Sequence, residues 1–248
     1  MPRSPFPSRH ADISIALDPH GLQPNAYGVP PAIALAYSGD GFTLDTRAGG
    51  SCNCEVITFL PHCHGTHTES VGHLTAERFP ITAVQLPLFL SCSLISVTPN
   101  GLEVRADQIE RALREIAPEF LESLVVRTLP NSRDKGTRRW EDATTPYFTV
   151  EAMAVIRAKG VQHLLVDLPS LDPLYDDGRL AAHRVFWDMP AGSKELPNEE
   201  ARRRTVTEMV FVHDDVPDGC YTLTIQAPHI VTDAVPSRPI LFFLDEGE

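Results

Sequence analysis

The chain has 248 residues, 42% of them hydrophobic and 22% charged, a composition typical of a globular protein long enough to bury a sizeable core. Acidic residues outnumber basic ones by 33 to 21, which gives a formal net charge of -12. Because phosphate backbones and anionic membrane surfaces repel such a protein, the composition argues against nucleic acid and membranes as partners.

The sequence predicts one domain over residues 1–248, located in the cytoplasm. The first ten residues lack the apolar stretch of a secretory signal. The longest apolar run, residues 83–97, is shorter than a membrane span and is interrupted by a proline and serines. The five cysteines, an odd number, fit reduced thiols better than a disulfide framework. Cys52 and Cys54 could be a metal pair, but without a second pair we favour structural thiols.

Strands dominate the predicted elements. Residues 11–17 alternate apolar and polar side chains and predict a first strand, which an irregular crossing rich in proline and glycine follows over residues 19–31. Long loops of this kind often carry function. Residues 55–60 are β-branched and apolar, and we expect a strand there, with residues 62–73 following its end. Further strands are expected at residues 82–90, 94–97, 124–129, 162–168, 206–212, 221–225 and 239–244.

Two helices are expected. Residues 107–117 carry apolar side chains at helical spacing, with Asp107 as the expected N-cap. A second helix is expected over residues 150–159, capped by Thr149 and ended by Gly160. Seven or more strands with two clear helices predict a strand-rich α+β fold or a β-rich barrel rather than a doubly wound sheet.

The chemically densest stretch is residues 62–73, which read His-Cys-His-Gly-Thr-His-Thr-Glu-Ser-Val-Gly-His. In an extended chain, successive side chains point to opposite faces. One face would then carry Cys63, His67, Glu69 and His73, and the other His62 and His64. Thiolate, imidazole and carboxylate are donors that bind zinc. The stretch therefore predicts a metal site or a substrate site.

Two other interpretations of this stretch stay open. Its histidines could be ordinary hydrogen-bonded residues at the end of a strand, since few histidines bind metals. Cys63 could instead be a nucleophile activated by a histidine. Because His62 and His64 would point away from Cys63, the base would then be His67, His73 or a distant residue.

At residues 63–73 the sequence resembles the cyclase family that includes bacterial kynurenine formamidase and isatin hydrolase, whose signature reads His-x-Gly-Thr-His-x-Asp-x-Pro-x-His. The residues here are Cys-His-Gly-Thr-His-Thr-Glu-Ser-Val-Gly-His. Further similar features are an Asp-Ile-Ser opening at residues 12–14, a helix-Gly-strand-Asp unit that ends at Asp167, and a closing Pro-x-Gly-x-Tyr-x-Leu at residues 217–223. The resemblance covers most of the chain and implies a swivelling β/β/α barrel.

The resemblance also implies a divalent metal, usually zinc or manganese. Its ligands would be the first two histidines and the aspartate of the signature, completed by a later histidine and a later glutamate. The matching residues are Cys63, His67, Glu69, His183 and Glu208, with Glu195 as the alternative to Glu208. In some members the carboxylate of the signature bridges a second ion. The last histidine of the signature, His73 here, would transfer protons.

Two departures from the signature bear on the metal. Cysteine at the first position keeps a good zinc donor and disfavours manganese, so zinc is the expected cofactor. Glutamate at the third position is one methylene longer than aspartate, and the backbone has to compensate if donor distances are to be kept.

These features predict a metal-dependent hydrolase of an amide or a small cyclic amide. Zinc lowers the pKa of bound water to about 7, which prepares water to attack a carbonyl carbon with His73 as acid or base. The alternative, suggested by the two departures, is a family member without catalysis that binds a small molecule or has a structural role. The expected partner is a small-molecule substrate. The resemblance further implies a homodimer or homotetramer, with the proline-rich crossing as a candidate exchange surface.

Several residues outside the signature have two interpretations each. Asp167, Ser170 and Asp172 could line the pocket or stabilise a turn. Trp140, Tyr147 and Phe148 could form an aromatic wall for the substrate or pack in the core. The polar loop of residues 130–146 could cover the site or be solvated.

Overall fold

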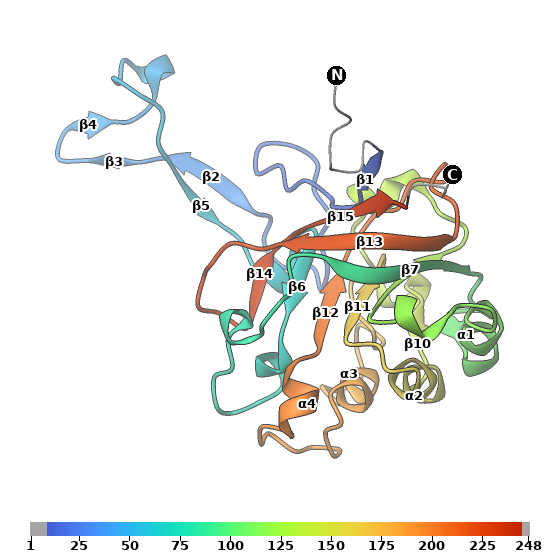
Figure 1. The fold of residues 1–248 in the computed structure, drawn as a ribbon. Coiled ribbons are helices and arrows are strands. Elements are labelled where there is room, and N and C mark those ends of the chain that lie inside the picture. The colour runs from blue at the N-terminus through green and yellow to red at the C-terminus, as the bar shows by residue number, and fades with distance from the viewer. Residues whose placement is uncertain (1–8, 245–248) are drawn as a thin grey trace.

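A nine-stranded mixed sheet forms the centre of the structure, a computed structural model that describes residues 9–244 (Figure 1). The strand order across the sheet is β1-β15-β13-β7-β9-β11-β12-β6-β14. The bounds are β1 His10–Asp12, β6 His67–Glu69, β7 Leu90–Val97, β9 Ser123–Thr128, β11 His163–Val166, β12 Thr205–Glu208, β13 Gly219–Gln226, β14 Ala234–Pro236 and β15 Arg238–Phe243. Strands β7, β9, β11 and β12 run parallel, and the remaining neighbours pair antiparallel.

Both faces of the central strands are buried, which explains their nearly continuous apolar sequence. In β9, Leu124 and Val126 belong to one hydrophobic cluster, whereas Val125 between them belongs to another. The first cluster includes residues of α1 (Ala106–Ala112), α2 (Val150–Ala158) and α3 (Ala181–Phe186), which pack on one face of the sheet (Figure 1). On the other face, β7, β13 and β15 curl over and bury their own apolar side chains.

The second predicted helix is confirmed almost to the residue. Helix α2 spans Val150–Ala158, and the Thr149 hydroxyl accepts a hydrogen bond from the Ala152 N–H (3.2 Å). Gly160 follows with a left-handed φ of 85°, a conformation that glycine adopts without strain. The remaining helix, α4 (Glu199–Arg202), is a single turn before β12.

Several of the predicted elements were partly wrong. The first strand, predicted at residues 11–17, spans only His10–Asp12, and the first helix, predicted over residues 107–117, ends at Ala112. Helix α1 begins at Ala106 rather than Asp107, because the Gln108 side chain accepts the Arg105 N–H (2.8 Å) and closes the first turn earlier. The predicted strand at residues 82–90 is absent except for its last residue. A 3-10 turn at Ile81–Ala83 and irregular chain replace it, since the prolines around this turn lack the N–H that a sheet needs.

A long ribbon projects from the body of the molecule (Figure 1). It consists of β2 (Ile33–Ala36) paired with β5 (Glu55–Thr58), extended by the short pair β3 (Ser38–Gly39) and β4 (Phe42–Thr43). The predicted strand at residues 55–60 therefore exists in part, but it lies outside the central sheet. A further small pair, β8 (Glu103–Val104) and β10 (Tyr147–Phe148), lies near α1 and α2.

The expected strand-rich α+β fold with few helices is confirmed. The curled half of the central sheet is compatible with a swivelling β/β/α barrel, which stays a prediction. Within residues 9–244, no helix has the length and apolar character needed to cross a membrane.

Candidate metal centre

Four buried donor side chains converge where β6, β12 and α3 meet. Strands β6 and β12 pair antiparallel with His67 opposite Glu208, which places these two side chains on the same face of the sheet. Glu69 lies two residues along β6 and therefore on that face as well. Helix α3 adds His183 from the adjoining layer.

The distances between these donors match those of ligands around one ion. His183 Nε2 lies 3.2 Å from Glu69 Oε1 and 3.3 Å from Glu208 Oε1, and His67 Nε2 lies 3.4 Å from Glu208 Oε2. A tetrahedral zinc site with bonds near 2.0–2.1 Å has donor–donor edges of about 3.3 Å. The structure thus brings together four of the five predicted ligands.

The hydrogen bonding of these donors also fits a cation. Although all are buried, His67 Nε2, His183 Nε2 and both carboxylate oxygens of Glu69 have no hydrogen-bond partner. An unsatisfied buried polar group costs about 1–3 kcal/mol, and native proteins contain few of them. A divalent cation bonded to these atoms would satisfy all four.

Neighbouring groups orient both imidazoles toward the centre. His183 Nδ1 contacts Asp172 Oδ2 at 2.6 Å, and His67 Nδ1 contacts the Gly65 carbonyl oxygen at 3.1 Å. Each contact engages one ring nitrogen and directs the other, Nε2, at the carboxylates. Glu208 is held by the Leu171 N–H, which donates to its Oε1 (3.1 Å).

The charges of the centre favour a bound cation. Burial alone would raise the pKa of Glu69, but His73 and His183 hold it well below its usual range. The pKa of Glu208 is also lowered, because His183 and His67 outweigh its burial and the repulsion from Glu69. Both carboxylates are therefore ionised at neutral pH, which is the form that binds metals.

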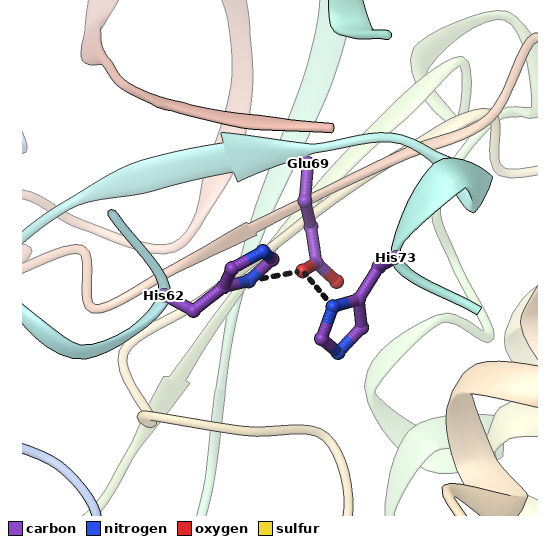
Figure 2. Close-up of side chains that lie close together, drawn as sticks. All are labelled: His62, Glu69 and His73. Atoms are coloured by element: carbon purple, nitrogen blue, oxygen red, sulfur yellow. Dashed lines mark ion pairs between the residues drawn. The ribbon is translucent and has the colours of Figure 1, made fainter. Parts of the chain in front are cut away.

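A second group of donors adjoins the first through Glu69. Figure 2 shows His62 and His73 on either side of the Glu69 carboxylate. His62 Nδ1 lies 2.9 Å and His73 Nδ1 4.0 Å from Glu69 Oε2. The other nitrogen of His62 contacts Asp233 Oδ2 at 2.9 Å. Although burial lowers the pKa of His62, the Asp233 and Glu69 carboxylates raise it to about 10.

The alternation predicted for residues 62–73 was wrong at its beginning. Pro61–Cys63 form a 3-10 turn, and Gly65 has a left-handed φ of 74°, so the chain is extended only from His67 to Glu69. The turn rotates His62 toward Glu69. Sequence reasoning therefore missed His62 and also Asp233, which no local pattern connects with this stretch.

The structure does not place Cys63 among the closest donors. In the described part of the chain, the two groups of donor atoms within 4.8 Å of one another are His62, Glu69 and His73, and His67, Glu69 and Glu208. Cys63 is buried, and burial followed by the charge of Glu208 raises the pKa of its thiol to about 11. A protonated thiol is a weak nucleophile, which weakens the cysteine hydrolase interpretation. Its role as a ligand stays a prediction.

Glu195 and His64 lie away from the centre. Glu195 is exposed, so Glu208 is the late glutamate that reaches the donors. His64 accepts a hydrogen bond from the Leu60 N–H at Nδ1 (3.0 Å), and its Nε2 contacts the Pro30 carbonyl oxygen (3.1 Å). It fastens the proline-rich crossing to the turn before β6.

A pocket of about 380 Å³ opens over the donors. His62, His73, His183 and Glu208 form its polar end. The wall residues are Tyr27, Pro169, Ser170, Pro173, Leu174, Tyr175, Asp176, Asp177, Gly178 and Leu180. The aromatic wall is thus formed by Tyr27 and Tyr175, which meet edge to face with ring centroids 6.3 Å apart. Burial and the Glu208 charge raise the pKa of Tyr27 to about 12, so its hydroxyl remains protonated.

The structure shows where the other residues with two interpretations lie. Trp140 and Phe148 pack in the core, and Tyr147 does not line the pocket. Ser170 lines the pocket and Asp172 positions His183. Asp167 is instead a buried structural group, which accepts hydrogen bonds from Lys135 Nζ (2.7 Å) and Thr128. Lys135 thereby fastens the loop of residues 130–146 to the core. Cys52 and Cys54 are exposed free thiols.

Known structures with the same fold cover nearly the whole chain. A predicted metal-dependent hydrolase from Bacillus stearothermophilus is 15% identical and superposes with a TM-score of 0.64 over 94% of this chain and 97% of its own. A potential metal-dependent hydrolase with cyclase activity is 16% identical, with a TM-score of 0.66 over 94% and 96%. Isatin hydrolase A from Labrenzia aggregata is 16% identical, with a TM-score of 0.64 over 94% and 93%.

The sequence itself identifies the family. The family model for cyclases, described as "Putative cyclase", matches residues 11–173, a range that contains the signature at residues 63–73 and strands β6, β7, β9 and β11 of the central sheet. The match extends over more than half of the chain and agrees with the resemblance read from the signature. The chain belongs to the cyclase family.

Proposed function

We propose that this protein is a metal-dependent hydrolase of a small amide or cyclic amide. The observation that carries the proposal is a set of four buried donor side chains beneath an open pocket, of which His67, Glu69 and His183 have donor atoms without a hydrogen-bond partner. Two imidazoles and two carboxylates form a donor set that suits zinc. The fold shared with an isatin hydrolase and a potential cyclase supports the same reaction class.

The chain's own residues have distinct roles in this proposal. His67, Glu69, His183 and Glu208 would hold the cation, which when bound polarises a carbonyl group and lowers the pKa of water to about 7. His73 lies at the edge of the pocket with 27% of its side chain exposed, where a substrate can reach it. There it can accept a proton from water or donate one to the leaving nitrogen.

The pocket walls favour a flat, mostly apolar substrate. Tyr27, Leu174, Tyr175 and Leu180 line the pocket, and the polar donors lie at its other end. An aryl amide or a ring-fused cyclic amide could place its ring against the tyrosines and its carbonyl oxygen toward the donors. The Tyr27 hydroxyl offers an additional hydrogen-bond donor beside the centre.

The role of His73 is tested by His73→Ala. We expect turnover to fall by roughly 100- to 10,000-fold, the usual contribution of a general acid or base, while the metal content stays near that of the wild type. Metal content is measured by elemental analysis and turnover by ultraviolet absorbance. His229→Ala, at an exposed histidine, is the matched control. Loss of metal on His73→Ala, or unchanged turnover, would remove the assigned role.

The competing function is a family member that binds a small molecule without catalysis. Protein purified without a histidine tag is analysed for bound metal and assayed with aryl formamides and cyclic amides, isatin included. Bound metal together with metal-dependent hydrolysis supports the enzyme. A protein without metal and without turnover, even after zinc is added, would favour the binding protein.

A further inference from the structure

We propose that His62, rather than Cys63, is the metal ligand that replaces the first histidine of the signature. His62 contacts Glu69, the same carboxylate that His183 contacts from the other side. The inference rests on the proposed metal dependence and deepens it. It shifts the first ligand by one residue relative to the family signature, and it assigns a metal role to a residue outside that signature.

The first support is where the His62 ring points. Its Nδ1 lies 2.9 Å from Glu69 Oε2, in an ion-pair contact that lacks hydrogen-bond geometry, and Glu69 Oε2 counts among the buried oxygens without a hydrogen-bond partner. The rings of His62 and His67 lie edge to face with centroids 5.4 Å apart. A donor nitrogen of His62 thus lies within 4.8 Å of a Glu69 oxygen, close enough for both to bind one cation, whereas His67 is grouped with Glu69 and Glu208.

The second support is the way His62 is anchored. Asp233 Oδ2 contacts His62 Nε2 at 2.9 Å, which leaves Nδ1 for the centre. His183 is anchored in the same way through its other nitrogen: Asp172 contacts Nδ1, which leaves Nε2 for the centre. A carboxylate behind each imidazole is the arrangement that orients histidine ligands of metals. Asp233 is itself tied to β6, because its carbonyl oxygen accepts the Ser70 N–H (2.9 Å).

The third support is the different setting of Cys63. Within the described chain, its sulfur belongs to neither group of donor atoms that lie within 4.8 Å of one another, whereas His62 belongs to one of them. The 3-10 turn at Pro61–Cys63 explains the exchange, because neighbouring side chains in such a turn point in different directions. The turn thus directs His62 at Glu69.

The geometry also explains why two departures from the signature occur together. Glu69 is one methylene longer than the aspartate of the signature, and its Oε2 is the atom that meets His62 while Oε1 meets His183. A longer carboxylate reaches a histidine displaced by one residue. The two changes compensate each other, so the centre keeps its donors.

Metal binding by His62→Ala and Cys63→Ser, measured on the full chain, tests the assignment. Each protein is stripped of metal and titrated with Zn²⁺ by calorimetry, and then with Co²⁺ while absorbance is recorded. We expect Cys63→Ser to match the wild type, and His62→Ala to lose one equivalent of metal or to bind it at least 10-fold more weakly. Neither the wild type nor Cys63→Ser should show the near-ultraviolet charge-transfer band of a cobalt–thiolate bond.

Asp233→Asn is the second variant, because it keeps the His62 side chain and weakens only its anchor. We expect a smaller loss of affinity than for His62→Ala, which separates a ligand role from a folding defect. A cobalt–thiolate band, weaker binding by Cys63→Ser, or unchanged binding by both His62→Ala and Asp233→Asn would overturn the assignment while leaving the metal dependence intact. A wild type that binds no Zn²⁺ or Co²⁺ would overturn both proposals.

Discussion

At the scale of single residues, Glu69 is the centre of the site. Its side chain is completely buried, and each carboxylate oxygen faces a different histidine, Oε1 toward His183 and Oε2 toward His62. A buried carboxylate is stable only if positive charge surrounds it, and three histidines lower its pKa here.

Asp172 is a positioning residue whose effect can be measured through His183. In Asp172→Asn the contact with His183 Nδ1 loses its charge, so the imidazole becomes a weaker and less well oriented donor. We expect the affinity for Zn²⁺ to fall 10- to 100-fold, measured by calorimetric titration of the metal-free protein. Asp177→Asn, on the rim of the same pocket with its side chain 90% exposed, is the control and should bind zinc like the wild type. Equal affinities of the two variants would contradict this role for Asp172.

At the scale of elements, short segments place the donors. Strand β6 has only three residues, and two of them point into the centre. Strand β12 ends at Glu208 because Met209 adopts a left-handed φ of 54°, so the carboxylate lies where regular pairing stops. Chain turns on both sides of β6 bring His62 and His73 to the same carboxylate. None of these breaks in regular structure follows from residue propensity alone.

The projecting ribbon exposes apolar side chains that no other part of the described chain covers. The cross-strand pair Leu35 and Val56 is 63% and 53% exposed, and Ile33, Tyr37, Phe42 and Ile57 are exposed as well. An isolated two-stranded ribbon is marginal in water and needs a surface to pack on. The predicted homodimer or homotetramer would supply one, and we propose that the ribbon packs against a second copy of the chain.

The ribbon proposal is tested by Leu35→Asp with Val56→Asp. Because two charges would be desolvated in the contact between copies, we expect the oligomer to dissociate into monomers in light scattering after size exclusion. The control is Val150→Ser, which changes an equally apolar and 42% exposed residue on α2 and should leave the oligomer intact. A monomeric wild type, or a double variant that remains an oligomer, would contradict the proposal.

At the scale of the whole molecule, a buried histidine far from the centre couples stability to pH. His163 begins β11, and its Nδ1 contacts Thr205 Oγ1 on the neighbouring strand at 2.9 Å. Burial lowers the pKa of His163 to about 4 from 6.5. Below pH 6.5 the unfolded chain therefore binds a proton that the folded protein does not bind until about pH 4, and stability falls with pH over this window.

His163→Gln removes this titration. By linkage, His163 lowers the free energy of unfolding by about 2 kcal/mol at pH 5 relative to pH 7, and by about 3 kcal/mol below pH 4. We expect urea unfolding of the variant to show a pH dependence shallower by that amount between pH 7 and pH 5, whatever its stability at pH 7. His10→Gln, at an exposed histidine, is the matched control. Identical slopes for wild type and His163→Gln would contradict the lowered pKa of His163 in the folded protein.

The whole molecule also explains which predictions from the sequence succeeded. The strands at β9, β11, β13 and β15 and the helix α2 were predicted because both faces of the central sheet are buried and Thr149 with Gly160 marks the helix ends. Residues 82–90 are just as apolar, yet they form irregular chain around a 3-10 turn. Hydrophobicity indicates burial, but backbone pairing in a sheet also needs N–H groups that prolines lack.

The sequence by itself determined the family, the strand-rich class and the donor types. The signature at residues 63–73 indicated His67, Glu69 and His73, and the resemblance to the cyclase family indicated His183 and Glu208. Such inferences can be made from the sequence because the order of residues and their chemistry are local properties. The tertiary structure alone decided which donors meet, because that depends on contacts between segments far apart in sequence. It chose Glu208 over Glu195, placed Asp233 behind His62, and turned His62 toward Glu69 through a left-handed glycine and a 3-10 turn.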